Sequence, residues 1–285
     1  MLCPGKINEF LSVGELDGRG YHPIRTIYSS INLCDILTIS ACEAHRVEFI
    51  NAEIPEINTV TKALNYLENE CGIKLPKIYI KIVKNIPIEA GLGGGSSNAG
   101  AVLRFGFQFA QKTNNEITEK ILNKWVENSW IIGADVPFFV KCGRATGESY
   151  GEVLKPLPDI ANVPLIVVKP KANCSTKEAY NQLDSKPRIF KEFPLNKEFL
   201  SQPYNDFERT APCECIEIAE DLRKQGAYAA MLSGSGSAVF GAFESMSIRD
   251  TAFKHFVNSP FLQVFSCETM PAFSNKGIDL TKMRF

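Results

Sequence analysis

A glycine-rich run from residue 91 to residue 98 is the local pattern with the clearest chemical meaning. Glycines fill four of the five positions from 91 to 95, and glycine lets a backbone approach a ligand closely and adopt a positive φ. Two serines then offer N-caps for a following helix, whose free N–H groups and positive dipole end suit phosphate. The run is neither GxxxxGK[ST] nor GxGxxG, so it predicts a phosphate site of another kind or, alternatively, a flexible surface turn. Its residues are Gly91, Leu92, Gly93, Gly94, Gly95, Ser96, Ser97 and Asn98.

A lone aspartate among small and apolar residues is the second candidate for chemistry. Asp135 lies within the run Gly133-Ala134-Asp135-Val136-Pro137-Phe138-Phe139. A carboxylate at this point can cap a helix that has Pro137 in its first turn. It can equally accept the proton of a substrate hydroxyl during phosphoryl transfer. The run by itself leaves both roles open.

A lysine near the start of the sequence is the third candidate. Lys6 stands between Gly5 and Ile7 on an expected strand, and Asn8 follows two positions later. Near an aspartate, such a cation would keep the carboxylate ionised and stabilise charge on a transferring phosphoryl group. The alternative is an ordinary solvated lysine at the edge of a strand.

Two shorter patterns offer ligand contacts. Ser233-Gly234-Ser235-Gly236-Ser237 precedes an apolar run and forms either a second anion nest of backbone N–H groups or a plain hairpin loop. The adjacent Tyr21 and His22 can stack on a base-like group and hydrogen-bond to it. A surface pair with no ligand is the alternative for these two rings.

The elements that must position these residues follow from hydrophobic periodicity. Strands and helices are mixed without strict alternation, which indicates an α+β fold. Three prolines between residues 156 and 164 mark the best boundary, giving an N-terminal domain of residues 1–157 and a C-terminal domain of residues 158–285. We expect strands at 6–13, 26–40, 77–84 and 165–168, helices at 58–70, from about 97, at 117–126 and at 214–224, and a loop and strand at 233–243.

Composition excludes several functional classes. The net charge is −1, from 31 basic and 32 acidic residues, and without a long basic run no nucleic-acid surface is expected. No apolar stretch approaches the ~18–20 residues of a membrane span, and the first residues lack the pattern of a signal peptide. Nine scattered cysteines without paired CxxC units predict no zinc site and reduced thiols in the cytoplasm.

In these residues and their order the sequence resembles the GHMP kinases, the superfamily of galactokinase, homoserine kinase and mevalonate kinase. The combination of motifs is specific, whereas no single motif is. Three motifs carry the resemblance: Pro4 to Asn8, Pro87 to Ala99 and Ser233 to Ser237. Further marks resemble the branch whose substrate carries a diphosphocytidyl group: Gly20-Tyr21-His22, the Gly133 to Phe139 run, Cys174-Ser175-Thr176 with Tyr180, and Asn205-Asp206-Phe207-Glu208.

A few positions depart from the family pattern. Gly5 stands where alanine is usual, and Glu9 stands where an apolar residue is usual. Leu232 separates Met231 from Ser233, where the family has methionine directly before the serine. The turn from Gly14 is one residue longer than the family's usual run. In that turn Arg19-Gly20 separates Asp17-Gly18 from Tyr21-His22, which bears on the geometry of the cytidine pocket more than on the chemistry.

The resemblance implies a fold of two α+β domains with the active site in a cleft between them, the first with ribosomal-protein-S5-like topology. It implies that Asp135 is the general base and that Lys6 orients it and stabilises charge. The ATP-phosphate loop falls on Pro87 and on Gly91 to Ser97. ATP is expected with Mg²⁺, which phosphate oxygens and water would mainly chelate.

The substrate implied by the resemblance is a small molecule, a diphosphocytidyl-linked alcohol of the non-mevalonate isoprenoid pathway. The cytidine pocket falls near Tyr21 and His22, with Tyr180 as a stacking ring. Further contacts are expected from Asn8, Ser235 and Gly236. Two alternatives stay open: another GHMP kinase acting on homoserine, mevalonate or a sugar, and a non-catalytic ATP-binding module.

Overall fold

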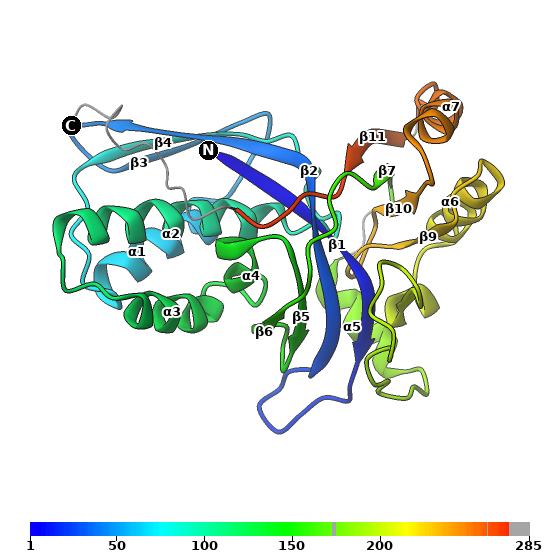
Figure 1. The fold of residues 1–285 in the computed structure, drawn as a ribbon, viewed down its shortest axis with the longest axis horizontal. Helices are drawn as coiled ribbons and strands as arrows, with labels where there is room; N and C mark the ends of the chain where they lie inside the picture. The colour runs from blue at the N-terminus through cyan, green and yellow to red at the C-terminus, as the bar shows by residue number, and fades with distance from the viewer. Residues whose placement is uncertain (173–174, 261, 274–285) are drawn as a thin grey trace.

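The structure is a computed structural model that describes residues 1–172, 175–260 and 262–273 (Figure 1). Cys174, part of one motif singled out above, lies outside these residues. Helices and strands are mixed along the chain, which confirms the α+β class. The strands are β1 (Leu2–Val13), β2 (Ile24–Ala41), β3 (Arg46–Ile50), β4 (Ile78–Val83), β5 (Arg144–Glu148), β6 (Val153–Pro156), β7 (Pro164–Pro170), β8 (Tyr204–Asn205), β9 (Ala229–Leu232), β10 (Val239–Ala242) and β11 (Leu262–Glu268). The helices are α1 (Thr59–Asn69), α2 (Gly94–Thr113), α3 (Glu119–Asn128), α4 (Val136–Lys141), α5 (Thr176–Asp184), α6 (Cys213–Lys224) and α7 (Met246–Phe256), with 3-10 turns η1 (Ser129–Ile131) and η2 (Asp206–Arg209).

The larger sheet is built around two long antiparallel strands, β1 and β2. Its order is β3-β4-β2-β1-β8, and β5 pairs with the first part of β2 and carries β6 beside it. Helices α1 to α4 lie on one side of this sheet (Figure 1). Alternation in β4 turns Ile78, Ile80 and Ile82 into the core beneath the sheet, where they pack with α2 residues such as Phe105. The register places Asn8 opposite Tyr28, which brings two polar side chains together next to the cavity described below.

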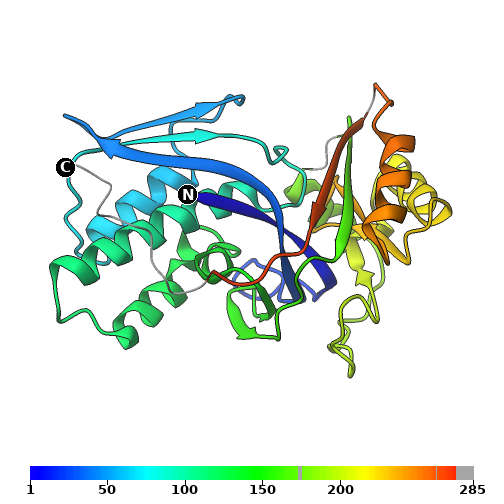
Figure 2. The same ribbon diagram turned by 45° about the horizontal axis from the view of Figure 1, so that its top comes forward.

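The smaller sheet comes from the later part of the chain. Its order is β11-β7-β10-β9, with every pair antiparallel. Helices α6 and α7 pack on its outer side (Figure 2), and every residue of β7 is buried. One segment, β8, returns to pair in parallel with β1 of the larger sheet. The division of the chain at residue 157 therefore stays a prediction.

The helix after the glycine-rich run begins earlier than predicted. Helix α2 starts at Gly94, and its N-cap is Gly93, which has a φ of +72° and makes no side-chain cap. The prediction that Ser96 and Ser97 cap this helix is wrong, because both serines lie within its first turn. No helix in the described ranges, α2 included, is long and apolar enough to cross a membrane.

Candidate active site

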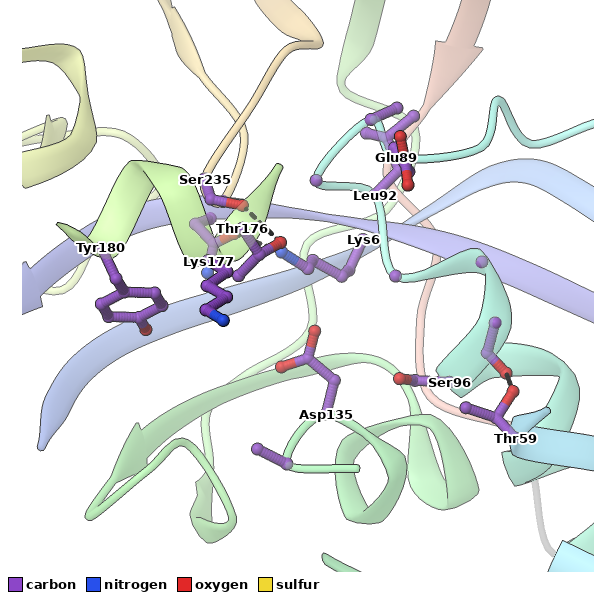
Figure 3. Close-up of a pocket in the computed structure, with 18 of the residues that line it drawn as sticks. Lys6, Thr59, Glu89, Leu92, Ser96, Asp135, Thr176, Lys177, Tyr180 and Ser235 are labelled. Atoms are coloured by element: carbon purple, nitrogen blue, oxygen red, sulfur yellow. Dashed lines mark hydrogen bonds between the residues drawn. The ribbon is translucent and has the colours of Figure 1, made fainter. Parts of the chain in front are cut away.

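One cavity of about 830 Å³ brings most of the predicted site residues together (Figure 3). Its walls come from β1, the turn at 14–22, the glycine-rich loop, the start of α4, helix α5 and the loop at 233–236. Two predicted residues do not reach the wall, because Ser97 and Gly236 are buried behind it. The predicted residues that line it are Lys6, Asn8, Tyr21, His22, Pro87, Gly91, Leu92, Gly93, Gly94, Gly95, Ser96, Asp135, Tyr180 and Ser235.

Two glycines of the loop are required by its close packing. Gly91 has a φ of +74°, and a Cβ there would lie 2.0 Å from the carbonyl oxygen of Ser233. Gly93 has a φ of +72°, and its Cβ would lie 2.6 Å from the ring of Phe139. The main-chain N–H of Lys6 donates to the carbonyl of Leu92 at 3.0 Å. The glycine-rich loop therefore packs tightly between β1 and the 233–237 loop. Within it, Gly91 and Gly93 are the positions with positive φ.

The first turn of α2 has the properties of an anion site. Its N–H groups have no partner within the helix, and the dipole places partial positive charge there. Thr59, at the start of α1, donates to the carbonyl of Gly95 at 2.7 Å, so the ends of two helices meet at this point. The hydroxyl oxygen of Ser97 is buried without a hydrogen-bond partner among the described residues. The free N–H groups and the dipole of this turn fit a phosphate chain lying on the loop, whereas the Ser97 hydroxyl does not reach the cavity.

Lys6 is a buried cation rather than a solvated one. Its side chain passes Gly93 and ends against Gly234, where a Cβ would lie 3.0 Å from Nζ. Nζ donates to Oδ1 of Asn8 at 2.6 Å, and Asn8 Nδ2 donates to Thr26 Oγ1 at 2.7 Å. Burial lowers the pKa of Lys6, while the negative charge of Asp135 opposes that shift. The Lys6 amine is therefore held in place by Asn8, and a negative group in the cavity favours its charged form.

Asp135 occupies the N-cap position of α4 but does not cap it. Its side chain makes no capping hydrogen bond and instead accepts one from the hydroxyl of Tyr28, at 2.9 Å to Oδ1. The carboxylate is directed toward Lys6 and Lys177 across the cavity (Figure 3). No ion pair joins Lys6 to Asp135 within the described part of the chain, so Lys6 influences the carboxylate through its charge rather than through a bond.

An aromatic cluster closes the end of the cavity far from the glycine-rich loop. The ring of His22 stacks on that of Tyr180, with centroids 4.9 Å apart, and the ring of Phe207 lies nearly perpendicular to that of Tyr180 with centroids 4.9 Å apart. Tyr21 is 58% exposed and lies 5.2 Å from the ring of Tyr150. Flat apolar faces with an imidazole among them can bind a heterocyclic base.

The turn that carries Tyr21 and His22 is held from both sides. Within it, Asp17 accepts a hydrogen bond from the Tyr150 hydroxyl at 2.6 Å, and that bond lowers the pKa of Asp17 to about 2. Behind it, the buried guanidinium of Arg188 donates to the carbonyls of Val13 and Gly14 at 3.1 and 2.9 Å. The aromatic end is therefore a fixed structure rather than a loose loop.

Several residues of this site escaped the sequence-based prediction. Tyr28 lies in a strand, where an aromatic side chain is ordinary, and Arg188 lies in a segment with no periodic pattern. Of the residues on helix α5, only Tyr180 was predicted as a site residue, but the helix also lines the cavity with Lys177, Asn181 and Asp184, which are ordinary polar residues of an amphipathic helix. The hydroxyls of Thr176 and Ser235 lie 3.1 Å apart and join α5 to the 233–237 loop.

Comparison with known proteins gives the same picture of the fold. The family model for the GHMP kinases N terminal domain matches residues 58–143, which include the glycine-rich loop and Asp135. A solved structure of mevalonate kinase from Methanococcus jannaschii superposes with a TM-score of 0.66 at 17% identity, over 95% of this chain and 98% of that one. Fold and site together define an ATP-dependent small-molecule kinase of the GHMP class.

More similar relatives define the family within that class. A 4-diphosphocytidyl-2-C-methyl-D-erythritol kinase from Desulfotalea psychrophila is 35% identical over 86% of this chain and 85% of its own length. One from Bacteroides fragilis is 34% identical over 84% of this chain and 89% of its own. A solved 4-(cytidine 5'-diphospho)-2C-methyl-D-erythritol kinase superposes with a TM-score of 0.77 at 27% identity, over 94% of this chain and 98% of that one. The chain belongs to the 4-diphosphocytidyl-2-C-methyl-D-erythritol kinase family.

Proposed function

We propose that this enzyme transfers the γ-phosphoryl group of ATP to the 2-hydroxyl of 4-diphosphocytidyl-2-C-methyl-D-erythritol. The observation that carries the proposal is the position of Lys6 and Asp135 in the middle of one cavity. On one side of them lies the glycine-rich loop at the start of α2, and on the other lies the aromatic cluster of Tyr21, His22 and Tyr180. A phosphate donor and a cytidine-linked acceptor can therefore meet at the pair from opposite ends.

In this mechanism Asp135 is the general base. The oxygen of the substrate hydroxyl forms a bond to the γ-phosphorus while the bond from that phosphorus to the β,γ-bridging oxygen breaks, and the proton passes to Asp135. A tertiary alcohol is a hindered nucleophile, so correct placement contributes as much as basicity. Lys6, buried beside the 233–237 loop, offsets negative charge on the transferring group.

The glycine-rich loop would hold the nucleotide. The N–H groups at the start of α2 suit the β- and γ-phosphates. The same cavity continues to Phe49, Ile54 and Ile88, whose apolar surfaces suit the adenine ring. Mg²⁺ would enter with ATP and neutralise phosphate charge, its ligands being mainly phosphate oxygens and water.

The aromatic cluster would bind the cytosine of the acceptor. Tyr21 offers an exposed ring, Tyr180 a half-buried one, and His22 a pair of ring nitrogens that can donate or accept. Asn8 and Ser235 line the same cavity, where they would contact the acceptor alcohol or a phosphate. Gly236 would contribute only by shaping the 233–237 loop, since it lies behind the wall.

We place the enzyme in the reducing cytoplasm. Among the cysteines within the described ranges, Cys3, Cys142 and Cys267 are buried thiols. Burial raises the pKa of Cys3 to about 11 and that of Cys142 to about 12, so these thiols are unreactive core groups. Small apolar side chains of this kind need no oxidising environment.

The chemical identity of the product tests the proposal. Incubation with ATP, Mg²⁺ and the cytidine-linked alcohol should give ADP and a new phosphomonoester on the methylerythritol carbon that bears the methyl group, visible by phosphorus NMR with carbon coupling. Phosphorylation at another hydroxyl would contradict the proposed alignment of the acceptor. ATP binding without any phosphorylated product would favour the alternative, a non-catalytic ATP-binding module.

A further inference from the structure

The direct partner of Asp135 comes from an unexpected strand. Tyr28, in the first half of β2, donates its hydroxyl proton to Oδ1 of Asp135 at 2.9 Å. The two residues are 107 positions apart in the sequence, so only the fold brings them together. Within the described chain, Asp135 has no ion-pair partner and its side chain makes no capping bond. The tyrosine hydroxyl is therefore the contact that fixes the direction of the carboxylate.

The ring of Tyr28 is itself tightly placed. It is only 1% exposed and packs against Phe138, whose ring centroid lies 4.8 Å away. Two glycines leave the space that it occupies. A Cβ on Gly147 would lie 2.8 Å from a ring carbon of Tyr28, and a Cβ on Gly151 would lie 2.4 Å from its hydroxyl oxygen. Any side chain at these positions would push the hydroxyl away from its present place.

The Tyr28 hydroxyl can act only as a donor toward the carboxylate. Burial raises its pKa well above 10, and the negative charge of Asp135 raises it further, so the phenol keeps its proton at any working pH. A carboxylate has two oxygens that accept hydrogen bonds. With Oδ1 engaged by Tyr28, Oδ2 stays available for the proton of the acceptor hydroxyl.

We infer that Tyr28 is a positioning residue for the reaction: it holds Asp135 so that one carboxylate oxygen faces the acceptor hydroxyl. The inference rests on the proposed role of Asp135 as general base and adds the residue that orients its carboxylate. Lys6 is held by a separate chain of bonds through Asn8 and Thr26. The two members of the catalytic pair thus have different hydrogen-bond partners, although Lys6 Nζ also lies 5.9 Å from the centre of the Tyr28 ring.

Tyr28→Phe tests this inference, because it keeps the ring and removes only the hydroxyl. A hydrogen bond to a charged group is strong enough that we expect kcat to fall roughly tenfold or more. The KM values for ATP and for the acceptor should stay within about twofold of the original enzyme, because a positioning role acts after binding. Tyr66→Phe is the matched control: Tyr66 is also buried, and its hydroxyl donates to the Trp125 carbonyl at 2.7 Å. The Tyr66→Phe enzyme should lose some folding stability and keep the kcat of the original enzyme.

Two combinations separate positioning from general damage. In an Asp135→Asn background, Tyr28→Phe should cause no further loss, because the hydroxyl then has no base to aim. Gly151→Ala, which alters a residue outside the cavity wall, should lower kcat in the original enzyme and much less in the Tyr28→Phe variant, which has no hydroxyl to displace. Thermal melting shows which variants are folded at the assay temperature.

The possible outcomes separate a failure of the Tyr28 inference from a failure of the proposed function. A Tyr28→Phe enzyme with unchanged kcat overturns the inference and leaves the proposed function standing. A raised acceptor KM with unchanged kcat also overturns it, because Tyr28 would then bind the acceptor instead. If the original enzyme makes no ADP with the cytidine-linked alcohol, the proposed function fails and the inference falls with it.

Discussion

At the scale of single residues, Asp135 carries the chemical claim. It stands at a helix start without capping it and accepts a hydrogen bond from Tyr28 at Oδ1, which leaves Oδ2 for proton transfer. Asp135→Asn should keep ATP binding and lose turnover by at least ~10²-fold, the usual scale for a general base. An amide has nearly the same shape but cannot accept the proton. Calorimetric titration with ATP and a coupled ADP assay measure the two properties separately.

A second aspartate provides the control for that substitution. Asp221 pairs with His255 at 2.8 Å on the surface and does not line the cavity. Asp221→Asn should leave turnover unchanged. Near-normal turnover in Asp135→Asn would remove Asp135 from the mechanism.

At the same scale, His22 and Arg188 together test the cytidine end. The Arg188 guanidinium donates to the Gly14 carbonyl and lies 3.3 Å from His22 Nδ1, so both side chains shape one surface. An unpaired polar edge in a buried pocket costs about 1–3 kcal/mol. We therefore expect His22→Ala and Arg188→Ala each to raise the acceptor KM by roughly tenfold or more, with the KM for ATP unchanged.

Steady-state titrations of both substrates check this expectation. Arg46→Ala, which breaks an exposed ion pair with Glu48 on β3, should change neither KM. The stacked ring of Tyr180 gives a further comparison, and Tyr180→Ala should resemble His22→Ala. If His22→Ala or Tyr180→Ala impairs ATP binding and leaves the acceptor KM unchanged, the cytidine site has been assigned to the wrong part of the cavity.

At the scale of elements, the start of α2 makes a prediction about the nucleotide. Gly95 lies in the first turn, lines the cavity and has ordinary helical φ, and a Cβ there would meet only Thr59 Oγ1, at 3.4 Å. Gly95→Val should therefore fold normally but place a branched side chain where phosphate must approach. We expect its KM for ATP to rise roughly tenfold or more, since charge-assisted bonds to phosphate are strong.

Gly93→Val is the contrasting variant within the same loop. Its positive φ and the Phe139 ring 2.6 Å from the new Cβ make a loss of folding stability the expected result. Thermal melting with and without ATP distinguishes the two variants. A Gly95→Val enzyme with unchanged ATP affinity would show that phosphate does not lie on this turn.

At the scale of the whole molecule, one buried ion pair links distant segments. Both side chains are nearly inaccessible, and Arg144 Nε and Nη2 donate to Glu9 Oε1 and Oε2 at 2.6 and 2.7 Å. Arg144 also donates to the Lys197 carbonyl, so β1, β5 and the segment after α5 meet there. Glu9→Ala would leave the arginine buried and unpaired, and we expect a loss of about 3–5 kcal/mol in unfolding free energy.

Urea denaturation measures that loss, and an exposed pair sets the baseline. Lys155 and Glu148 lie on the surface at 2.9 Å, and Glu148→Ala should cost no more than ~1 kcal/mol. Equal effects of the two substitutions would mean that the buried pair contributes little to the connection between these segments.

The sequence predicted those parts of the molecule whose signal is local. The glycine-rich run has a composition typical of a phosphate-binding loop, and Asp135 is a carboxylate among small and apolar residues. Both were therefore identified as candidate site residues from the sequence. Tyr28 was missed because an aromatic residue in a strand is ordinary, and its contact with Asp135 depends on strand pairing and on two distant glycines. The start of α2 was misplaced because serine is a common N-cap, whereas here the backbone of Gly93 begins the helix without a side-chain cap.

Selectivity among alcohols tests the central claim most directly. ADP release should be measured at one ATP and Mg²⁺ concentration with the cytidine-linked methylerythritol, and separately with mevalonate, homoserine and galactose. The arrangement of Tyr21, His22 and Tyr180 at one end of the cavity, with Lys6 and Asp135 at its centre, predicts release that depends on the cytidine-linked alcohol and stays near background with the other three. Faster release with any of the other alcohols would contradict the assignment.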